Sequence, residues 1–418
     1  MTDASGIATA GRALEHAGIA WAILRLTFDP NRPLGDVDVL VEPAGIDRAA
    51  DVLRGLDFIR LPWTDGSSRG VLRYDAANDG WLWLDLQDQL VFGGRRLSEA
   101  TVREVLARRR RAADLALLDP GDEFWVILAR TLLEGRSLEG RHRDRLTVLV
   151  EDVPDDAAPI ARWIDEIRQR PGLAARSREL VAEGSWTALR ELGPGRPAGR
   201  PARAAGRRLR AIAHALPRLL TPRGRRAPSV ALLGPDGAGK STLALTLEDR
   251  YPFATRRIYM GVGPPPGTPR KRFLLAASAS AAGLLLQWWR FLTGRYHQYR
   301  GRLVIFDRYM EDPWLPLPPG ASVARRIGRR VRSAISCPPA DLMVVLDAPG
   351  AAMFGRKGEH SAGLLEAQRE RYLRLGDRVP NVIVVDTTAG AEAVARRVAG
   401  LLWERLVATW GGASAKRM

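Results

Sequence analysis

Hydrophobic and polar positions alternate in two separate regions of the chain. Over residues 19–118, short apolar runs ("IAWAIL", "DVDVLV", "WLWLDL") alternate with amphipathic segments such as "IDRAADVLRGLDF", which predicts a small α/β domain. Residues 119–191 show helical periodicity without a convincing strand and predict a helical appendage. A second alternation, with the apolar runs "SVALL", "LVIF" and "LMVVLD", predicts another α/β domain over residues 229–410.

The segment between these regions is basic and rich in glycine and proline. From Leu192 to Pro235 the sequence has ten arginines and no carboxylate, so residues 192–228 are predicted to be a solvated linker. A second interpretation is that "RRLRAIAHALPRLL" forms a basic amphipathic helix that contacts an acidic membrane or a nucleic acid. We favour the linker, because a charged stretch of this kind is more often a solvated connector.

Composition narrows the classes of protein to consider. The chain has 418 residues, more than one domain usually contains, and a net charge of +17. The charge indicates an anionic partner, but it does not distinguish a nucleotide from a nucleic acid or an acidic membrane. A competing interpretation is that the arginine excess only reflects a GC-rich coding sequence. Cys337 is the only cysteine, which excludes an internal disulfide and any cysteine-based metal cluster. The N-terminus lacks the pattern of a signal peptide, so a cytoplasmic location is expected.

The stretch "LLGPDGAGKSTLALTLEDR" has the spacing of a phosphate-binding loop between a strand and a helix. In such a loop, glycines let the backbone N–H groups approach the phosphates. Lys240 is then expected to reach the β- and γ-phosphates of ATP, and the Ser241 hydroxyl to contact Mg²⁺. The predicted nucleotide-binding residues are Gly234, Asp236, Gly237, Ala238, Gly239, Lys240, Ser241 and Thr242.

Two further motifs supply charges suited to phosphoryl transfer. The strand "LVIFD" ends at Asp307, a position suited to a carboxylate that organises Mg²⁺, and Arg308 can bind a phosphate with two parallel hydrogen bonds. Arg356 and Lys357 are expected in a glycine-flanked mobile loop that closes over the transferring phosphate. The predicted catalytic residues are Lys240, Asp307, Arg308, Arg356 and Lys357.

Residues 229–410 contain the motifs "GPDGAGKST", "IFDRY" and "RKGE". With these motifs the region resembles the thymidylate kinase-like branch of the P-loop nucleoside monophosphate kinases. The resemblance implies a three-layer α/β/α fold with a parallel sheet, and ATP and Mg²⁺ as cofactors. It also implies that Asp236 faces the sugar or base of the acceptor, Arg308 its phosphate, and Arg356 and Lys357 the transferred group. The chain departs from the family at "MEDP" after Tyr309 and throughout residues 259–301. Thymidylate is therefore not the expected acceptor.

Two segments of this region raise the question of membrane contact. Residues 273–289 contain no charge but several Ala, Ser and Gly, so we predict a buried helix rather than a spanning one. "VARRIGRRVRSAI", residues 323–335, is amphipathic and equally consistent with a core-packed helix and a membrane-surface helix.

The first domain carries a candidate metal site. Asp36 and Asp38 are two residues apart on a predicted strand and therefore point to one face, and Asp85 lies on another apolar strand. Three carboxylates in this arrangement suit divalent metals. "RPLGDVDVLVEP" and the later "DL" resemble the nucleotidyltransferase superfamily, which implies a small α/β domain of that kind. Its usual Gly-Ser pair is missing, and either Arg25 takes that role or catalysis has been lost.

The sequence thus predicts an ATP-dependent phosphotransferase acting on a small, phosphorylated and hence anionic acceptor. One alternative is a nucleotide-gated binding module without an acceptor. Another makes the N-terminal domain a working nucleotidyltransferase that the kinase domain regulates. The oligomeric state is open, and a homodimer is one option.

Overall fold

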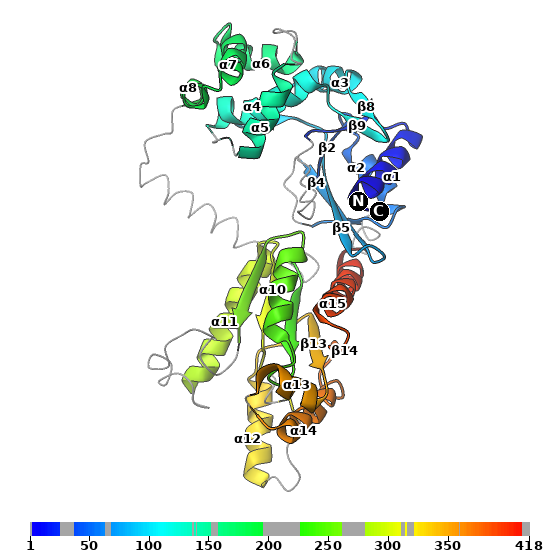
Figure 1. Cartoon of the computed structure of the whole chain (residues 1–418), viewed down its shortest axis with the longest axis vertical. Coiled ribbons are helices and arrows are strands. Elements are labelled where there is room, and N and C mark those ends of the chain that lie inside the picture. The colour runs from blue at the N-terminus through cyan, green and yellow to red at the C-terminus, as the bar shows by residue number, and fades with distance from the viewer. Residues whose placement is uncertain are drawn as a thin grey trace. The chain divides into compact units, whose positions relative to one another are not determined.

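The computed structural model describes most of the chain and divides it into two compact units. The described residues are 2–25, 37–62, 68–135, 138, 140–151, 158–194, 226–260, 281–310, 314–315, 322–358 and 360–411. The division of the chain falls between His214 and Ala215, and each unit is drawn in Figure 1. That boundary lies inside the predicted linker, whose residues 195–225 are outside the described ones.

The first unit is built on a mixed seven-stranded sheet. Its strand order is β3-β4-β5-β2-β1-β9-β8, and within it β2 pairs with β5 and β1 with β9 in parallel, the other pairs being antiparallel. The strands are β1 Trp21–Ile23, β2 Val37–Val41, β3 Ile59–Arg60, β4 Ser68–Asp75, β5 Gly80–Gln87, β8 Arg110–Ala112 and β9 Leu115–Leu117, and a separate hairpin joins β6 Val91–Phe92 to β7 Arg95–Arg96.

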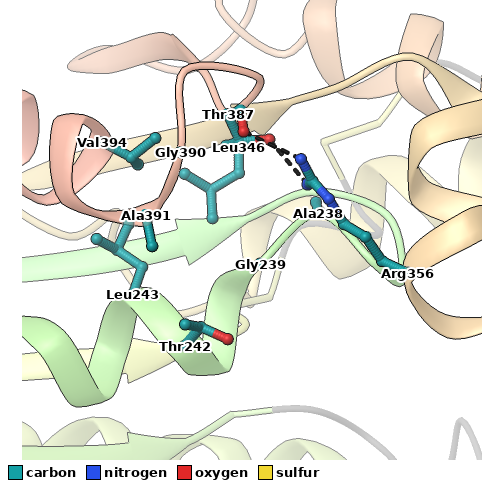
Figure 2. A pocket seen from close by; sticks show the side chains of 10 residues that line it. All are labelled: Ala238, Gly239, Thr242, Leu243, Leu346, Arg356, Thr387, Gly390, Ala391 and Val394. Atoms are coloured by element: carbon teal, nitrogen blue, oxygen red, sulfur yellow. Dashed lines mark hydrogen bonds between the residues drawn. The ribbon is translucent and has the colours of Figure 1, made fainter.

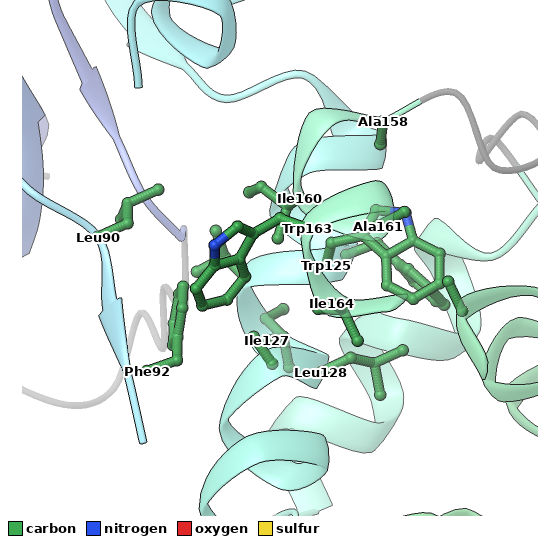
Figure 3. Close-up of a cluster of buried hydrophobic side chains, with 14 of the residues drawn as sticks. Leu90, Phe92, Trp125, Ile127, Leu128, Ala158, Ile160, Ala161, Trp163 and Ile164 are labelled. Atoms are coloured by element: carbon green, nitrogen blue, oxygen red, sulfur yellow. The ribbon is translucent and has the colours of Figure 1, made fainter. Parts of the chain in front are cut away.

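Two helical layers cover this sheet. Alternating strand residues such as Val39 and Leu84 pack under α1 (Thr2–His16) and α2 (Ile46–Arg54). The opposite face, with Leu40, shares a core with the remaining helices (Figure 3). These are α3 Glu99–Ala107, α4 Pro120–Glu134, α5 Gly140–Leu149, α6 Pro159–Arg168, α7 Leu173–Ala182 and α8 Trp186–Leu192. The segment predicted as an appendage is helical in its described residues and packs into one unit with the sheet.

Helix α4 lies at the centre of this second layer. Asp119 caps its N-terminus by accepting a hydrogen bond from the Gly121 amide, Pro120 occupies the first turn, and Gly135 ends it with φ +65°. Trp125 and Leu128 are fully buried among the neighbouring helices, as Figure 3 shows. A helix buried on nearly every side contributes much of the apolar area removed from water in this unit.

Asp122 is a charged residue in the buried first turn of α4. Its side chain is 0% exposed, and among the described residues neither carboxylate oxygen has a hydrogen-bond partner, with Arg108 Nε 3.5 Å away. Desolvation raises the pKa of Asp122 from its ordinary 3.8 to about 7, against the opposing charge of Arg108. The folded state therefore holds a proton on Asp122 over a pH range in which the unfolded chain does not.

This proton predicts a pH-dependent effect of Asp122→Asn. The Asp122 contribution to stability is fully present below about pH 4 and is lost as the pH rises through about 7, because the unfolded chain ionises first. The amide avoids that loss, so the variant should be more stable at pH 8 by on the order of 2 kcal/mol, since one pKa unit corresponds to about 1.4 kcal/mol and relaxation reduces the full shift. Denaturant unfolding of the full chain at pH 5 and pH 8 measures the difference. The exposed Asp114→Asn is the control, and equal effects of the two substitutions would contradict the prediction.

The second unit has a three-layer α/β/α fold around a parallel five-stranded sheet. Its strand order is β11-β12-β10-β13-β14, and every pair is parallel. The strands are β10 Ser229–Leu233, β11 Thr255–Tyr259, β12 Leu303–Asp307, β13 Leu342–Asp347 and β14 Val382–Asp386. The predicted strands "SVALL" and "LMVVLD" are present as β10 and β13.

Helices cover both faces of this sheet. The helices are α10 Lys240–Arg250, α11 Ala281–Tyr299, α12 Val323–Ala334, α13 Gly350–Lys357, α14 Ala362–Leu373 and α15 Ala391–Leu406, which continues as the π-helix Val407–Gly411. Helices α10 and α15 contact each other and the sheet. On the other face, Phe291 of α11 and Tyr372 of α14 share a hydrophobic core with the strand residues Ala231 and Phe306. The fold class expected from the sequence is confirmed.

Two helix predictions for this unit need correction. Arg356 and Lys357 lie in the last turn of α13, not in a loop, because the apolar spacing "AAMFG" extends a helix up to Gly358, whose φ is +67°. A buried helix was expected over residues 273–289, but in its described part, which belongs to α11, Leu285 and Trp289 are 69% and 66% exposed because the opposite side of the helix packs on β11 and β12. Residues 261–280, which include the start of the uncharged stretch, lie outside the described residues. Within the described helices, none is long and apolar enough to cross a bilayer.

Candidate functional site: a glycine loop at the carboxyl edge of the parallel sheet

The loop between β10 and α10 lies where the chain reverses direction across the sheet. From β10 the first connection leads to β11 at one edge, and the later strands β13 and β14 lie on the other side of β10. In open parallel sheets this switch point, at the carboxyl ends of the strands, leaves a crevice in which ligands bind. Topology therefore places the predicted phosphate-binding loop at the position where a site is expected.

Three glycines give the loop its shape. Gly234, Gly237 and Gly239 have φ values of +137°, +84° and +96°, a region that other residues rarely adopt. A Cβ on Gly234 would lie 2.8 Å from the Leu346 carbonyl oxygen of β13, so the loop also passes close to the neighbouring strand. The glycines thus explain both the turn of the loop and its contact with β13.

Lys240 begins α10 and turns back into the loop. Its side chain is only 7% exposed, and Nζ donates to the carbonyl oxygens of Gly234 at 2.8 Å and Pro235 at 2.6 Å. A buried ammonium is costly unless it is hydrogen-bonded, and here two loop carbonyls satisfy it. The geometry therefore fixes one positive charge at the centre of the loop, beside the N-terminus of α10.

Ser241 and Asp307 face each other across adjacent elements. Ser241 Oγ, in the first turn of α10, donates to Asp307 Oδ2 at 3.3 Å, and Asp307 ends β12 with 6% exposure. The parallel pairing of β10 and β12 places Leu232 beside Asp307, which brings the strand end to the base of the loop. A hydroxyl and a carboxylate oxygen are hard donors that suit Mg²⁺.

A second group of charges surrounds Asp236. Arg308 Nη2 donates to Asp236 Oδ1 at 2.6 Å, and His360 Nε2 lies 3.8 Å from Oδ2. Burial opposes ionisation of Asp236, but the charges of Arg308, Lys240 and Lys357 outweigh it and hold the pKa of this carboxyl below its ordinary value. Arg308 has φ +67°, an uncommon conformation for a residue with a side chain. Such backbone strain is often found at functional sites.

A pocket of about 300 Å³ lies against the loop (Figure 2). Thr242 and Leu243 of α10 and Leu346 of β13 line the pocket, while Arg356 of α13 donates to the Thr387 carbonyl oxygen at 3.1 Å. Its complete lining is Ala238, Gly239, Thr242, Leu243, Leu346, Arg356, Thr387, Gly390, Ala391 and Val394. The pocket is mainly apolar with a few polar groups, as small-molecule pockets usually are.

The structure thus brings Asp307 and Arg308 next to the predicted glycine loop. It also places Arg356 on the wall of the pocket. Sequence reasoning did not select Thr387, Gly390 or His360. Gly390, with φ +93° in "DTTAGAE", is the one for which the sequence held a signal, a glycine turn directly after a strand. The roles of all these side chains in binding or catalysis remain predictions.

The predicted metal site of the first unit is described only in part. Asp38 and Asp85 lie side by side in the parallel register of β2 and β5, and Asp36 is outside the described residues. Asp38 is buried and accepts hydrogen bonds from Arg25 Nε at 2.9 Å and Gln87 Nε2 at 3.1 Å. The described part of the chain holds no group of three metal-binding side chains. Metal binding by Asp36, Asp38 and Asp85 stays a prediction.

Comparison with known proteins gives structural neighbours only. No family model and no curated protein matches the chain. A deoxyadenosine kinase from M. mycoides is 15% identical, with a TM-score of 0.30 over 42% of this chain and 97% of that one. A thymidylate kinase from Candida albicans is 18% identical, with a TM-score of 0.31 over 44% and 92%. A gluconokinase from Sinorhizobium meliloti is 15% identical, with a TM-score of 0.25 over 46% and 100%.

Proposed function

We propose that the second unit is an ATP-dependent phosphotransferase that acts on a small, phosphorylated acceptor. The observation that supports this most is the buried ammonium of Lys240 inside a glycine loop at the switch point of a parallel sheet. An ammonium in that position can move from the loop carbonyls to the oxygens of a β- or γ-phosphate, and the positive N-terminus of α10 adds to its effect.

The donor nucleotide fits the loop and the adjoining pocket together. With its phosphates at Gly239 and Lys240, its nucleoside would enter the pocket past Thr242, where Leu243 and Val394 offer apolar contact. The Arg356 guanidinium, held by Thr387, lies on the wall of this pocket and can stack on a base or reach a phosphate. These contacts would orient the γ-phosphoryl group without a covalent bond to the protein, because in phosphoryl transfer the protein acts mainly by positioning and electrostatic stabilisation.

Ser241 and Asp307 fit the requirements of a Mg²⁺ site. Their oxygens converge from α10 and β12 at the base of the loop, and Asp307 is nearly buried. When bound, Mg²⁺ would neutralise charge on the β- and γ-phosphates. The chain's own part is to hold these two oxygens at a fixed place relative to Lys240.

The acceptor is proposed to bind beside Asp236. Arg308 offers a planar fork for a phosphate, and His360 lies close to the same carboxylate. None of Asp236, Arg308 and His360 is part of the lining of the nucleoside pocket. Separate places for donor and acceptor beside one loop favour a transferase over a nucleotide-gated module without an acceptor.

An acceptor screen with the full chain tests this function. The protein is incubated with γ-labelled ATP, Mg²⁺ and either nucleoside monophosphates or sugar phosphates, and transfer of label to the acceptor is followed. We expect multiple turnovers that depend on one class of phosphorylated acceptor. ATP binding without acceptor-dependent turnover in any class would favour the nucleotide-gated module.

Arg308→Ala should affect the acceptor more than ATP. A charge-assisted hydrogen bond contributes about 1.5–3 kcal/mol, so the KM for the acceptor should rise about 10- to 100-fold. The KM for ATP should change less than about threefold, because Arg308 is outside the nucleoside pocket. Arg308→Lys keeps the positive charge but loses the planar fork of two N–H donors. Its KM for the acceptor should therefore lie between those of the parent and Arg308→Ala. Steady-state kinetics with each substrate varied gives both constants, and a rise confined to the KM for ATP would move Arg308 to the donor side.

A further inference from the structure

Helix α12 exposes an apolar stripe that nothing in the described part of its unit covers. Val323, Ile327 and Val331 follow each other at intervals of four residues and are 67%, 56% and 53% exposed. Ile335, one residue after the helix, continues the stripe at 43% exposure. Four large aliphatic side chains in one exposed row pack no core among the described residues, which indicates a binding surface.

The same helix is strongly basic. Its sequence "VARRIGRRVRSA" contains five arginines, and residues 313–340 contain no Asp or Glu. Arg326 and Arg330, whose side chains the structure describes, are exposed. An apolar stripe flanked by arginines on an otherwise polar helix is the pattern of helices that lie in the plane of a membrane surface.

Helix α11 also carries exposed apolar side chains. Leu285, Trp289 and Leu292 are 69%, 66% and 57% exposed on one side of α11, whereas Gly294 packs against the Phe306 ring on the other. Trp288 Nε1 donates to the Ile335 carbonyl oxygen at 2.9 Å, which ties α11 to the end of α12. We call Leu285, Trp289, Leu292, Val323, Ile327 and Val331 the α11–α12 surface.

The charges of this surface select its partner. A second copy of the chain would bring two arginine rows together, and the sequence of α11 and α12 offers no carboxylate to neutralise them. A nucleic acid would satisfy the arginines but gains little from aliphatic side chains, because it is recognised through charge, hydrogen bonds and aromatic stacking. An anionic bilayer satisfies both, since its headgroups pair with arginine and its acyl region accepts valine, isoleucine and tryptophan.

We propose that the α11–α12 surface docks the protein peripherally on an anionic lipid bilayer. Helix α12 lies in the interface with Ile327 and Val331 at the acyl boundary and with Arg326 and Arg330 among the headgroups. Trp289 of α11 adds an aromatic ring of the kind enriched at the membrane–water interface. Docking uses none of the side chains of the proposed kinase site, so it can be tested separately.

Vesicle co-sedimentation of the full chain tests the proposal. The probes are vesicles of phosphatidylcholine alone and of phosphatidylcholine mixed with phosphatidylglycerol. We expect binding to the anionic vesicles that weakens as salt is raised, and little binding to the neutral ones. Arg326→Gln with Arg330→Gln should weaken binding about 25-fold, because one basic residue near an anionic surface contributes about fivefold. Ile327→Ser with Val331→Ser should also release the protein, and the exposed Val148→Ser of α5 is the matched control.

Circular dichroism checks that each variant is folded, and light scattering follows its oligomeric state. Unchanged monomer mass with lost vesicle binding in both double variants supports the proposal. Absence of binding to anionic vesicles, or equal binding by parent and variants, overturns it. A dimeric parent that Ile327→Ser with Val331→Ser makes monomeric identifies a second copy as the partner instead. If Ile327→Ser with Val331→Ser weakens oligonucleotide binding as much as it weakens vesicle binding, the proposal is overturned in favour of a nucleic acid.

Discussion

Lys240→Ala should reduce acceptor-dependent ATP turnover by at least about 10²-fold, the usual effect of removing one group that stabilises transition-state charge. Lys240 Nζ is buried in the loop and donates to two of its carbonyl oxygens, which hold the ammonium in place for an anion. The Asp236 carboxylate lies 3.9 Å away, at the limit of an ion pair. Initial rates with saturating ATP and acceptor measure the loss.

A matched variant on the same helix separates this effect from a general change of charge. Arg250→Ala also removes one cation from α10, but Arg250 pairs with the exposed Glu392 at 3.0 Å at the far end of the helix. Exposed pairs contribute only about 0–1 kcal/mol to stability, and Arg250 lies at the end of α10 opposite the loop, so turnover should be nearly unchanged. If Lys240→Ala keeps full turnover while folded, its ammonium serves only to hold the loop carbonyls, and the proposed function loses its main support.

The sequence predicted the central part of this site because each of its motifs is a short local pattern. Spacing within "GPDGAGKS" sets the loop, and the apolar runs before it and before Asp307 define two strands. Parallel strands present their carboxyl ends at one edge, so the loop and Asp307 were expected at the same edge of the sheet. The pairing of β10 with β12, which brings Ser241 to Asp307, comes from the strand order of the fold.

The other parts depend on contacts between distant segments. The pocket joins α10 with the turn after β14, residues more than a hundred positions apart, and no local pattern relates Thr242 to Thr387. Arg356 and Lys357 lie at the end of a helix because the apolar spacing continued past a glycine that was expected to begin a loop. The ion pair of Arg25 with Asp38 likewise needs the register of β1, β2 and β5.

The amphipathic pattern of a helix likewise does not show whether its apolar side is buried. The periodicity of residues 323–335 correctly predicted a helix, but a helical stripe of valine and isoleucine is the same whether a core or a partner covers it. Only the packing of the unit shows that Ile327 and Val331 are exposed. Burial is a property of the whole fold, so sequence can offer both interpretations without deciding between them.

Gly237→Ala should prevent the loop from taking its shape and weaken ATP binding by about 10²-fold, since a hydrogen bond to a charged group such as a phosphate contributes about 1.5–3 kcal/mol and the shifted loop would lose at least one. A Cβ on Gly237 would lie 2.5 Å from the Met353 carbonyl oxygen and 3.1 Å from its carbonyl carbon in α13. Those atoms belong to helical backbone and cannot rotate away. Gly237 also has φ +84°, and forcing alanine into the left-handed region costs about 1–2 kcal/mol.

A displaced loop would also change the wall of the proposed nucleoside pocket. Arg356 Nη1 donates to the Gly237 carbonyl oxygen at 3.4 Å, so a shift of Gly237 changes both the phosphate loop and the wall of the pocket. Gly355→Ala, on α13 itself, is the control, because a Cβ there meets nothing within 4 Å and helical alanine should stabilise by about 0.5–1 kcal/mol. The rise in thermal unfolding temperature with added ATP should vanish in Gly237→Ala and persist in Gly355→Ala. Equal ATP-induced shifts in the two variants would mean that nucleotide binding does not depend on the shape of this loop.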